Sequence, residues 1–237
     1  MSYEAVLFDL DNTLYPYAPC NEAGKRAALD ALRERGYELD RAAFDDLYAT
    51  GRRETKRETG GTAASHSRHV YFERGLYRHA GEPDVPGALA AGDAYWNGYL
   101  GAMSLCDGVE AVLDALDAAG VDVAVVTNLT TRVQLRKLVR LGVDDRVDLL
   151  VTSEEVGREK PSALPFTTAL AELDARPSGA LAVGDNPETD VAGANAVGID
   201  SALFVADGDA PPDADLPERR RPDRRIDAFA DLTEVAT

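Results

Sequence analysis

The sequence predicts an α/β protein whose parallel sheet is interrupted, after its first strand, by an all-helical insertion. From residue 107 on, short apolar runs alternate with helical patterns, which is typical of a parallel sheet covered by helices on both faces. Residues 17–105 show helical spacing and no convincing strand. The apolar run Glu4–Phe8 reads as a buried strand, and we assign it to the same sheet.

The inserted block is expected to contain four helices. We place them at Asn21–Gly36 with Asn21 as N-cap, at Arg41 to about Glu58, at Ser65–His79 and at Val85–Met103. Breaks at Gly60-Gly61 and at Gly81 to Pro83 separate the helices. We therefore predict that residues 17–105 form a domain of their own.

The second half of the chain alternates between helices and strands. Helices are expected at Gly108–Ala119, Thr131–Leu141, Ala163–Leu173 and Glu188–Val197, and strands at Val121–Thr127, Asp148–Thr152, Ala180–Val183 and near Ser201–Val205. A polar, proline-rich loop is expected from Asp207 to Arg225, and an edge strand with a turn of helix from Arg225 to Leu232. Together with residues 1–16, residues 106–237 are predicted to form the α/β core domain.

Length and composition narrow the class of protein. The 237 residues fit one large domain or a domain with an insertion. The N-terminus has no positively charged segment, and no stretch approaches the ~20 apolar residues of a membrane span, so we expect a cytoplasmic protein that does not bind membranes. The two cysteines form no CxxC pair, so free thiols are expected and a zinc site is not.

The charge balance is strongly acidic. Asp and Glu total 42 against 25 Lys and Arg, which gives a net charge of −17, and only Lys25, Lys56, Lys137 and Lys160 are lysines. This composition resembles that of proteins from halophilic organisms, where the short Debye length of ~3 Å at about 1 M salt screens the repulsion. The same charge argues against a nucleic-acid partner, which requires clustered cations.

Polar side chains stand at the ends of the predicted strands. Asp9 and Asp11 follow the first strand, Thr127 and Asn128 end the second, Lys160 follows the third across a loop, and Asp185 follows the fourth. Ligands of open α/β sheets bind beyond the carboxyl ends of the strands, so we expect these side chains to converge. Clustered carboxylates suit Mg²⁺ together with a phosphate, and two acids allow a covalent aspartyl-phosphate route with acid–base assistance.

Four motifs in order resemble those of the haloacid dehalogenase-like (HAD) superfamily. They are DLDNT at Asp9 to Thr13, VVTN at Val125 to Asn128, EKP at Glu159 to Pro161 and GDNPETD at Gly184 to Asp190. The resemblance covers essentially the whole core and implies a Rossmann-like fold. The helical block resembles the type-I (C1) cap of subfamily I.

The resemblance also implies a role for each motif residue. Asp9 would be the nucleophile and a Mg²⁺ ligand, and Asp11 the general acid/base with its main-chain carbonyl on the metal. Thr127 and Asn128 would hold the transferring phosphoryl group, and Lys160, also a catalytic residue, would neutralise the nucleophile and the phosphate. Asp185 would be the direct metal ligand, and Asp190 would act indirectly or through water. Thr13 would stabilise the loop or touch substrate, and Asn186 would cap a helix or bind the metal. Many relatives have glycine where this chain has Leu129, which puts the shape of the phosphate pocket in question.

The function predicted from these residues is Mg²⁺-dependent hydrolysis of a small phosphomonoester. Phosphoglycolate, glyceraldehyde 3-phosphate, nucleoside monophosphates and sugar phosphates all remain open as substrates, and the enzyme is expected to be a monomer or a homodimer. Hydrolytic dehalogenases of the family lack a second carboxylate in the first motif, so Asp11 argues against that activity. A phosphomutase and a non-catalytic binding protein of the same fold are the alternatives.

Overall fold

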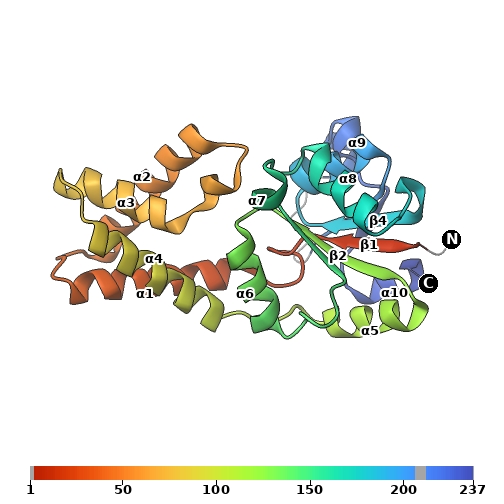
Figure 1. The fold of residues 1–237 in the computed structure, drawn as a ribbon, viewed down its shortest axis with the longest axis horizontal. Coiled ribbons are helices and arrows are strands. Elements are labelled where there is room, and N and C mark those ends of the chain that lie inside the picture. The colour runs from red at the N-terminus through yellow and green to blue at the C-terminus, as the bar shows by residue number, and fades with distance from the viewer. Residues whose placement is uncertain (1–2, 206–211, 237) are drawn as a thin grey trace. The chain divides into compact units, whose positions relative to one another are not determined.

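The computed structural model describes residues 3–205 and 212–236. Contacts between Cα atoms divide the chain into two compact units (Figure 1). One contains Met1–Pro16 and Ser104–Thr237, and the other contains Tyr17–Met103. We call the first the sheet unit and the second the helical unit, and describe each by itself.

A six-stranded parallel sheet forms the centre of the sheet unit. Its order is β3-β2-β1-β4-β5-β6, and the strands are β1 (Ala5–Phe8), β2 (Asp122–Thr127), β3 (Leu149–Thr152), β4 (Ala180–Gly184), β5 (Asp200–Phe204) and β6 (Arg224–Ile226). Every paired neighbour is parallel. The predicted α/β fold is confirmed, and β1 lies between β2 and β4, so the carboxyl ends of these three strands are adjacent.

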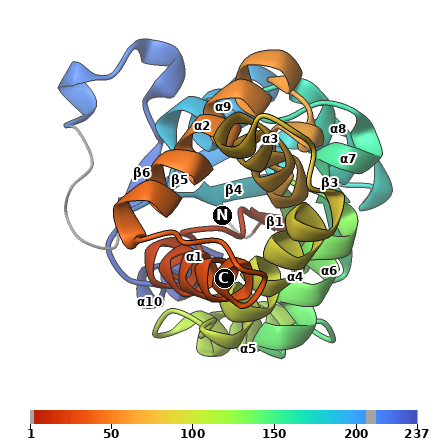
Figure 2. The ribbon, with the colours of Figure 1, turned by 90° about the vertical axis from the view of Figure 1, so that its left-hand side faces the viewer.

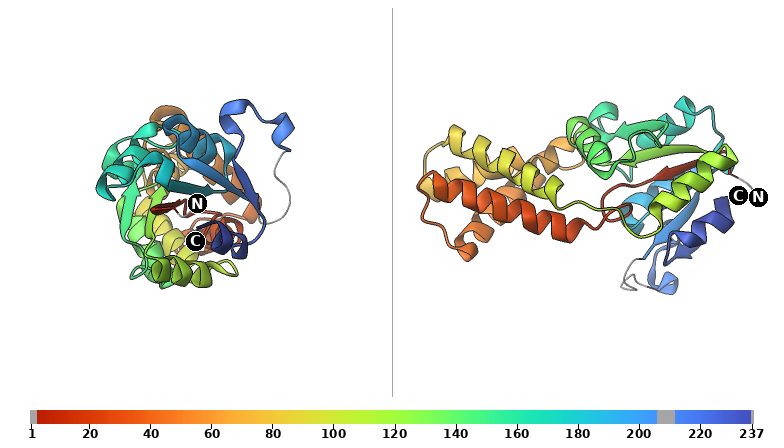
Figure 3. Two further views of the ribbon diagram at one scale, coloured as in Figure 1. Left: turned by 90° about the vertical axis from the view of Figure 1, so that its right-hand side faces the viewer. Right: turned by 90° about the horizontal axis from the view of Figure 1, so that it is seen from below.

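Helices cover both faces of this sheet. They are α5 (Val109–Ala119), α6 (Thr131–Leu141), α7 (Ser153–Val156), α8 (Ala163–Glu172), α9 (Ala192–Val197) and α10 (Ala230–Ala236). Figures 1 and 3 show α5 and α10 on one face and α8 and α9 on the other. Short 3₁₀ turns complete the unit: η2 (Pro177–Gly179), η4 (Asp213–Asp215) and η5 (Glu218–Arg220). Residues 207–211 of the predicted polar loop lie outside the described residues.

Alternate residues of the strands point to opposite faces and build two layers of core. On one face, Ala5 and Leu7 pack in a buried cluster with Phe166 of α8. On the other, the ring of Phe8 lies 6.4 Å from that of Phe229, next to α10. Because both faces are buried, these strands are continuously apolar, which is why the sequence reveals them.

The predicted helix at Glu188–Val197 was wrong at its beginning. The chain forms a π-helical turn, η3 (Pro187–Val191), before α9 begins at Ala192. Asn186 ends the preceding loop, and its side chain accepts a hydrogen bond from the Glu188 amide at 2.8 Å. Asp190 lies within this wider turn, and turns of this kind recur at functional sites.

Four long helices make up the helical unit: α1 (Tyr17–Glu34), α2 (Arg41–Thr59), α3 (Arg68–Ala80) and α4 (Val85–Gly101), with the 3₁₀ turn η1 (Ala63–His66) before α3. Figure 2 shows α1 beside α4 and α2 beside α3. Asp40, Ser67 and Asp84 accept hydrogen bonds from the first turns of α2, α3 and α4, as N-caps do. The predicted N-cap at Asn21 was wrong, because α1 begins at Tyr17 and Asn21 instead accepts from the hydroxyl of Tyr95 at 2.7 Å.

Glycines allow the paired helices to approach closely. A Cβ added to Gly51 of α2 would clash with the carbonyl oxygen of Tyr71 in α3, and one added to Gly75 would lie 2.6 Å from the carbonyl oxygen of Leu47. Main-chain atoms cannot rotate away as a flexible side chain can. The crossing of α2 and α3 therefore depends on the absence of side chains at both positions.

An aromatic core holds the helical unit together. Tyr71, Phe72, Tyr95, Trp96 and Tyr99 are buried in it, whereas Tyr77 is 43 % exposed. The guanidinium of Arg68 is buried among them, 5.1–5.2 Å from the ring centres of Tyr71, Tyr95 and Trp96. Cation–π attraction and hydrogen bonds from Arg68 to the His66 carbonyl oxygen and the Tyr17 hydroxyl compensate for burial of this charge.

Two predictions from composition can be compared with the described part of the chain. Cys20 and Cys106 are both free thiols, as predicted. None of the helices in the described ranges is both long enough and apolar enough to cross a membrane.

Candidate active site

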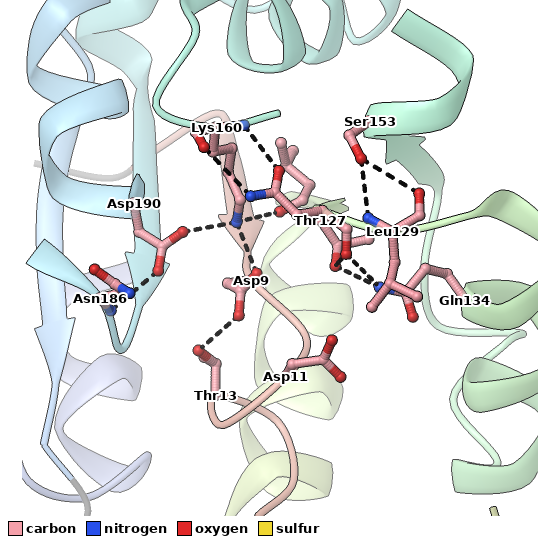
Figure 4. Close-up of polar contacts among 12 residues, drawn as sticks. Asp9, Asp11, Thr13, Thr127, Leu129, Gln134, Ser153, Lys160, Asn186 and Asp190 are labelled. Atoms are coloured by element: carbon pink, nitrogen blue, oxygen red, sulfur yellow. Dashed lines mark hydrogen bonds and ion pairs between the residues drawn. The ribbon is translucent and has the colours of Figure 1, made fainter. Parts of the chain in front are cut away.

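The candidate active site begins where β1 ends. The amide of Asp9 donates to the carbonyl oxygen of Val183 in β4 at 2.8 Å, so the residue directly after β1 is still fixed to the neighbouring strand. The buried hydroxyl of Thr13 donates to Oδ2 of Asp9 at 3.4 Å (Figure 4). The Asp9 carboxylate is therefore oriented by the loop that follows it.

Lys160 links the predicted motifs. Its Nζ lies 2.7 Å from each of three oxygens: Oδ1 of Asp9, Oδ1 of Asp190 and the carbonyl oxygen of Val126 in β2 (Figure 4). The side chain is 3 % exposed. Burial alone would lower the pKa of Lys160, but Asp190 and Asp9 raise it further than burial lowers it. Lys160 is thus a fixed positive charge between two carboxylates.

Three carboxylates lie close together near the Lys160 ammonium group. One oxygen from each of Asp9, Asp185 and Asp190 lies within 4.8 Å of the others. Burial raises the pKa of Asp9 above its usual range, with Lys160 opposing the shift and Asp190 and Asp185 adding to it. Burial and the charge of Asp190 raise the pKa of Asp185 to about 6. A partly buried excess of negative charge on oxygen ligands suits a hard divalent cation, so the donor set fits Mg²⁺.

The loop after β4 holds Asp185 and Asp190. Asn12 donates from Nδ2 to Oδ2 of Asp185 at 3.1 Å, and the Asn186 amide donates to Oδ2 of Asp190 at 3.1 Å. A Cβ on Gly184 would clash with the Asp190 carboxylate. Glycine at the end of β4 therefore lets Asp190 reach Lys160.

Asp11 lies apart from the carboxylate cluster. Its Oδ1 accepts from Nζ of Lys137 at 2.5 Å and also from the hydroxyl of Tyr15. Its side chain is 23 % exposed, more than that of Asp9. The two carboxylates of the first motif are thus held by different cations, Asp9 by Lys160 and Asp11 by Lys137.

The side chains of Thr127 and Asn128 have different hydrogen-bond partners. The Thr127 hydroxyl is buried and accepts from Nε2 of Gln134 in α6 at 2.6 Å. The Asn128 side chain holds the main chain of Lys160, accepting from its amide at 2.8 Å and donating to its carbonyl oxygen at 3.3 Å. The Asn128 side chain is therefore engaged in positioning Lys160, while Thr127 lies beside it at the end of β2.

Leu129 adopts the backbone conformation that glycine would favour, with φ of 141°. Its amide donates to the Ser153 hydroxyl at 2.9 Å, and that hydroxyl donates to the Leu129 carbonyl oxygen at 3.4 Å. The leucine side chain is buried. Two hydrogen bonds and burial of the side chain thus stabilise a strained residue directly after Asn128.

Sequence reasoning did not identify Tyr15, Gln134, Lys137 or Ser153 as neighbours of the motif residues. One signal was present, since Gln134 and Lys137 are three residues apart on α6 and share its buried face with Leu138. Polar residues on the buried face of an amphipathic helix call for a buried partner. The sequence around Ser153 and around Tyr15 contains no comparable pattern that would indicate a buried partner.

Comparison with known proteins defines the class. The family model for haloacid dehalogenase-like hydrolases matches residues 3–198. The chain therefore belongs to the haloacid dehalogenase-like hydrolase family and is an enzyme of that family, as the motifs predicted.

Its relatives include phosphatases from archaea. The chain is 53 % identical over 236 residues to a ribulose-1,5-bisphosphate 5-phosphatase of Halopiger xanaduensis, covering 98 % of this chain and 99 % of the relative. It is 34 % identical over 196 residues to a glyceraldehyde 3-phosphate phosphatase of Methanopyrus kandleri, covering 83 % and 81 %.

Solved structures share the fold. A 2-haloacid dehalogenase of Pseudomonas syringae pv. tomato has a TM-score of 0.77 at 25 % identity, covering 98 % of this chain and 97 % of that one. The magnesium-bound HAD hydrolase YfnB of Bacillus subtilis has a TM-score of 0.74 at 21 % identity, covering 100 % and 99 %.

Proposed function

We propose that this enzyme is a Mg²⁺-dependent phosphatase that hydrolyses a phosphorylated sugar through an aspartyl-phosphate intermediate. The observation that carries the proposal is the Lys160 ammonium between Asp9 and Asp190, with Asp185 completing a group of three carboxylates. The named phosphatases among the relatives support the reaction class.

Asp9 is the proposed nucleophile. Its carboxylate oxygen forms a bond to phosphorus while the ester P–O bond breaks and its electron pair leaves on the sugar oxygen. Asp11 donates a proton to that oxygen, and later takes a proton from the water that attacks the phosphorus and breaks the aspartyl–phosphate bond. Phosphate is released and both aspartates return to their starting states.

Other residues bind and orient the transferring group. Lys160 neutralises charge on Asp9 and on the phosphoryl oxygens, and Thr127 and Asn128 are proposed to contact those oxygens at the end of β2. Asp9, Asp185 and the Asp11 main-chain carbonyl are the proposed Mg²⁺ ligands, with Asp190 close enough to act directly or through water. The bound metal would supply charge neutralisation for the phosphoryl group.

Ribulose 1,5-bisphosphate is the first substrate to test, because the relative from Halopiger xanaduensis bears that activity in its name. Glyceraldehyde 3-phosphate is the second, on the same ground. The helical unit is the proposed cap that excludes water and selects among such substrates. The predicted halophilic source is in keeping with this relative, and the cytoplasmic location and the monomeric or dimeric state stay predictions.

Phosphate release in molar KCl tests the proposal. Wild type, Asp9→Asn and Asp122→Asn are assayed on a panel of sugar phosphates, with Mg²⁺ and with EDTA. Asp122 is an exposed carboxylate at the opposite end of the neighbouring strand β2, so it is the matched control.

We expect Mg²⁺-dependent release by wild type and by Asp122→Asn, and a loss of about a thousandfold or more in Asp9→Asn. Folded wild-type protein that releases no phosphate from any ester in the panel, or an Asp9→Asn variant that is as active as wild type, would contradict the proposed function.

A further inference from the structure

Lys137 is a buried cation close to the proposed acid/base residue. It lies on α6, its side chain is 1 % exposed, and its Nζ lies 2.5 Å from Oδ1 of Asp11. The ammonium group also lies 5.5 Å from the ring centre of Tyr15. Burying an ammonium group is costly unless it is paired and hydrogen-bonded, and the Asp11 carboxylate is one partner that compensates for this cost.

Tyr15 adds a second donor to the same oxygen. Its hydroxyl bonds Oδ1 of Asp11. The loop between the two residues closes on itself, because the Asn12 amide donates to the Tyr15 carbonyl oxygen at 3.0 Å and the Leu14 amide donates to the Leu10 carbonyl oxygen at 3.1 Å. The ring of Tyr15 is fully buried. Tyr15 is thus a fixed donor rather than a mobile surface group.

The two oxygens of Asp11 therefore differ. Oδ1 accepts from Lys137 and from Tyr15, whereas no hydrogen bond or ion pair from the described residues reaches Oδ2. A proton on Oδ1 would face two donors that already point at that atom. The free oxygen, Oδ2, is therefore the one that can carry a proton to another molecule.

We propose that Lys137, together with Tyr15, is a positioning residue that orients Asp11 so that Oδ2 delivers the proton to the leaving oxygen. The inference rests on the proposed phosphatase function. In this step the P–O ester bond breaks, its electron pair goes to the sugar oxygen, and the proton moves from Oδ2 of Asp11 to that oxygen. Lys137 and Tyr15 exchange no proton and act only by holding Oδ1.

The leaving group supplies a way to test this role. An alkoxide leaving from a sugar phosphate needs a proton, whereas p-nitrophenolate is stable without one. Misorienting Asp11 should therefore slow phosphoryl transfer from a sugar phosphate more than transfer from p-nitrophenyl phosphate. A variant that simply damaged the fold would slow both reactions equally.

The experiment compares kcat/KM for both substrates in molar KCl with Mg²⁺. The variants are Lys137→Met, which keeps a long unbranched side chain without the charge, and Tyr15→Phe, which keeps the ring without the hydroxyl. Arg132→Met is the matched control, because Arg132 is an exposed cation on the same helix. Circular dichroism and thermal unfolding verify that each variant is folded.

We expect Lys137→Met to lower kcat/KM for the sugar phosphate by about 10- to 100-fold, part of the 10²–10⁴ that acid–base catalysis contributes. The loss should appear in kcat rather than in KM, and p-nitrophenyl phosphate should lose less than about threefold. Tyr15→Phe should show the same selectivity with a smaller loss, and Arg132→Met should match wild type. If Lys137→Met does not fold, the comparison of kcat/KM for the two substrates in Tyr15→Phe tests the proposal by itself.

Equal losses on both substrates, or no loss on the sugar phosphate, would overturn the role of Lys137. If the wild type is active under these conditions, such a result contradicts the positioning role of Lys137 but does not contradict the proposed phosphatase function. Wild-type protein with no Mg²⁺-dependent release from either ester would overturn the proposed function and, with it, this inference.

Discussion

Replacing Lys160 with methionine removes its ammonium group from the carboxylate cluster. Lys160 forms ion pairs of 2.7 Å with both Asp9 and Asp190, and its side chain is 3 % exposed. Methionine has a similar length and no charge, so packing changes little. Asp9, Asp185 and Asp190 would then face one another without the charge of Lys160.

The expected cost is large because the pair is buried. Removing one partner of a buried ion pair typically costs about 3–5 kcal/mol. For a chain of this size that corresponds to a fall of about 6–20 °C in Tm, at about 2–4 °C per kcal/mol. Salt screens such a pair far less than it screens exposed charges, so the effect should persist in molar KCl.

Thermal unfolding followed by circular dichroism, with EDTA and with saturating Mg²⁺, measures this effect. We expect Lys160→Met to unfold at lower temperature in EDTA and to gain more from Mg²⁺ than wild type does, because the metal would replace the lost positive charge. Phosphate release should still fall by about 100-fold or more, since the transferring group loses a charged donor.

Lys25→Met is the matched control. Lys25 pairs with Asp45 at 2.8 Å, but the Asp45 side chain is 39 % exposed, so this variant should lose less than about 1 kcal/mol. The reasoning would be refuted if Lys160→Met were as stable as wild type in EDTA, or if Mg²⁺ stabilised both proteins by the same amount.

Three further predictions concern the stability of the fold. Gly51→Ala should lower the free energy of unfolding of the helical unit by about 1–3 kcal/mol or more in thermal unfolding, because the added Cβ would clash with the Tyr71 carbonyl oxygen. Gly101→Ala is the control and should not destabilise the unit, because the space around Gly101 is open. A hydrogen bond from Tyr37 and one from an amide of α4 hold the pKa of Asp84 below its usual range, so Asp84 stabilises the folded state above the unfolded pKa of about 3.9. That contribution is lost as pH falls through the pKa of Asp84 in the folded state. The free energy of unfolding of wild type and of Asp84→Asn is measured by denaturant titration, and the difference between the two should shrink below about pH 4. Dialysis into low-salt buffer should unfold the protein because its net charge of −17 is no longer screened, and an unchanged circular dichroism spectrum would contradict this.

Local patterns were sufficient to predict most of the secondary structure. The strands β1, β2 and β4 are continuous apolar runs bounded by polar residues, and α6 begins and ends at the predicted residues, Thr131 and Leu141. The errors fell where side chains or loop geometry override periodicity. Asn21 makes a tertiary hydrogen bond instead of a cap, and the π-helical turn at Pro187–Val191 replaces the first turn of a regular helix.

The candidate site was predictable to the extent that strand ends define it. Asp9, Thr127 and Asp185 follow neighbouring strands of a parallel sheet, so their proximity follows from the topology. The full carboxylate group was less predictable, because Asp190 lies in a π-helical turn and its position beside Lys160 depends on the missing Cβ of Gly184.

By itself, the sequence determined the family, the order of the elements and the residues that follow each strand, since these depend on neighbours along the chain. Only the tertiary structure decided which groups hold the motif residues. Lys137 is 126 residues from Asp11, and Ser153 is 24 residues from Leu129. No local pattern encodes such contacts, because they arise only when the sheet brings α6 and the start of α7 beside the strand ends. The partner of each buried polar group is therefore a property of the packed fold rather than of the sequence around it.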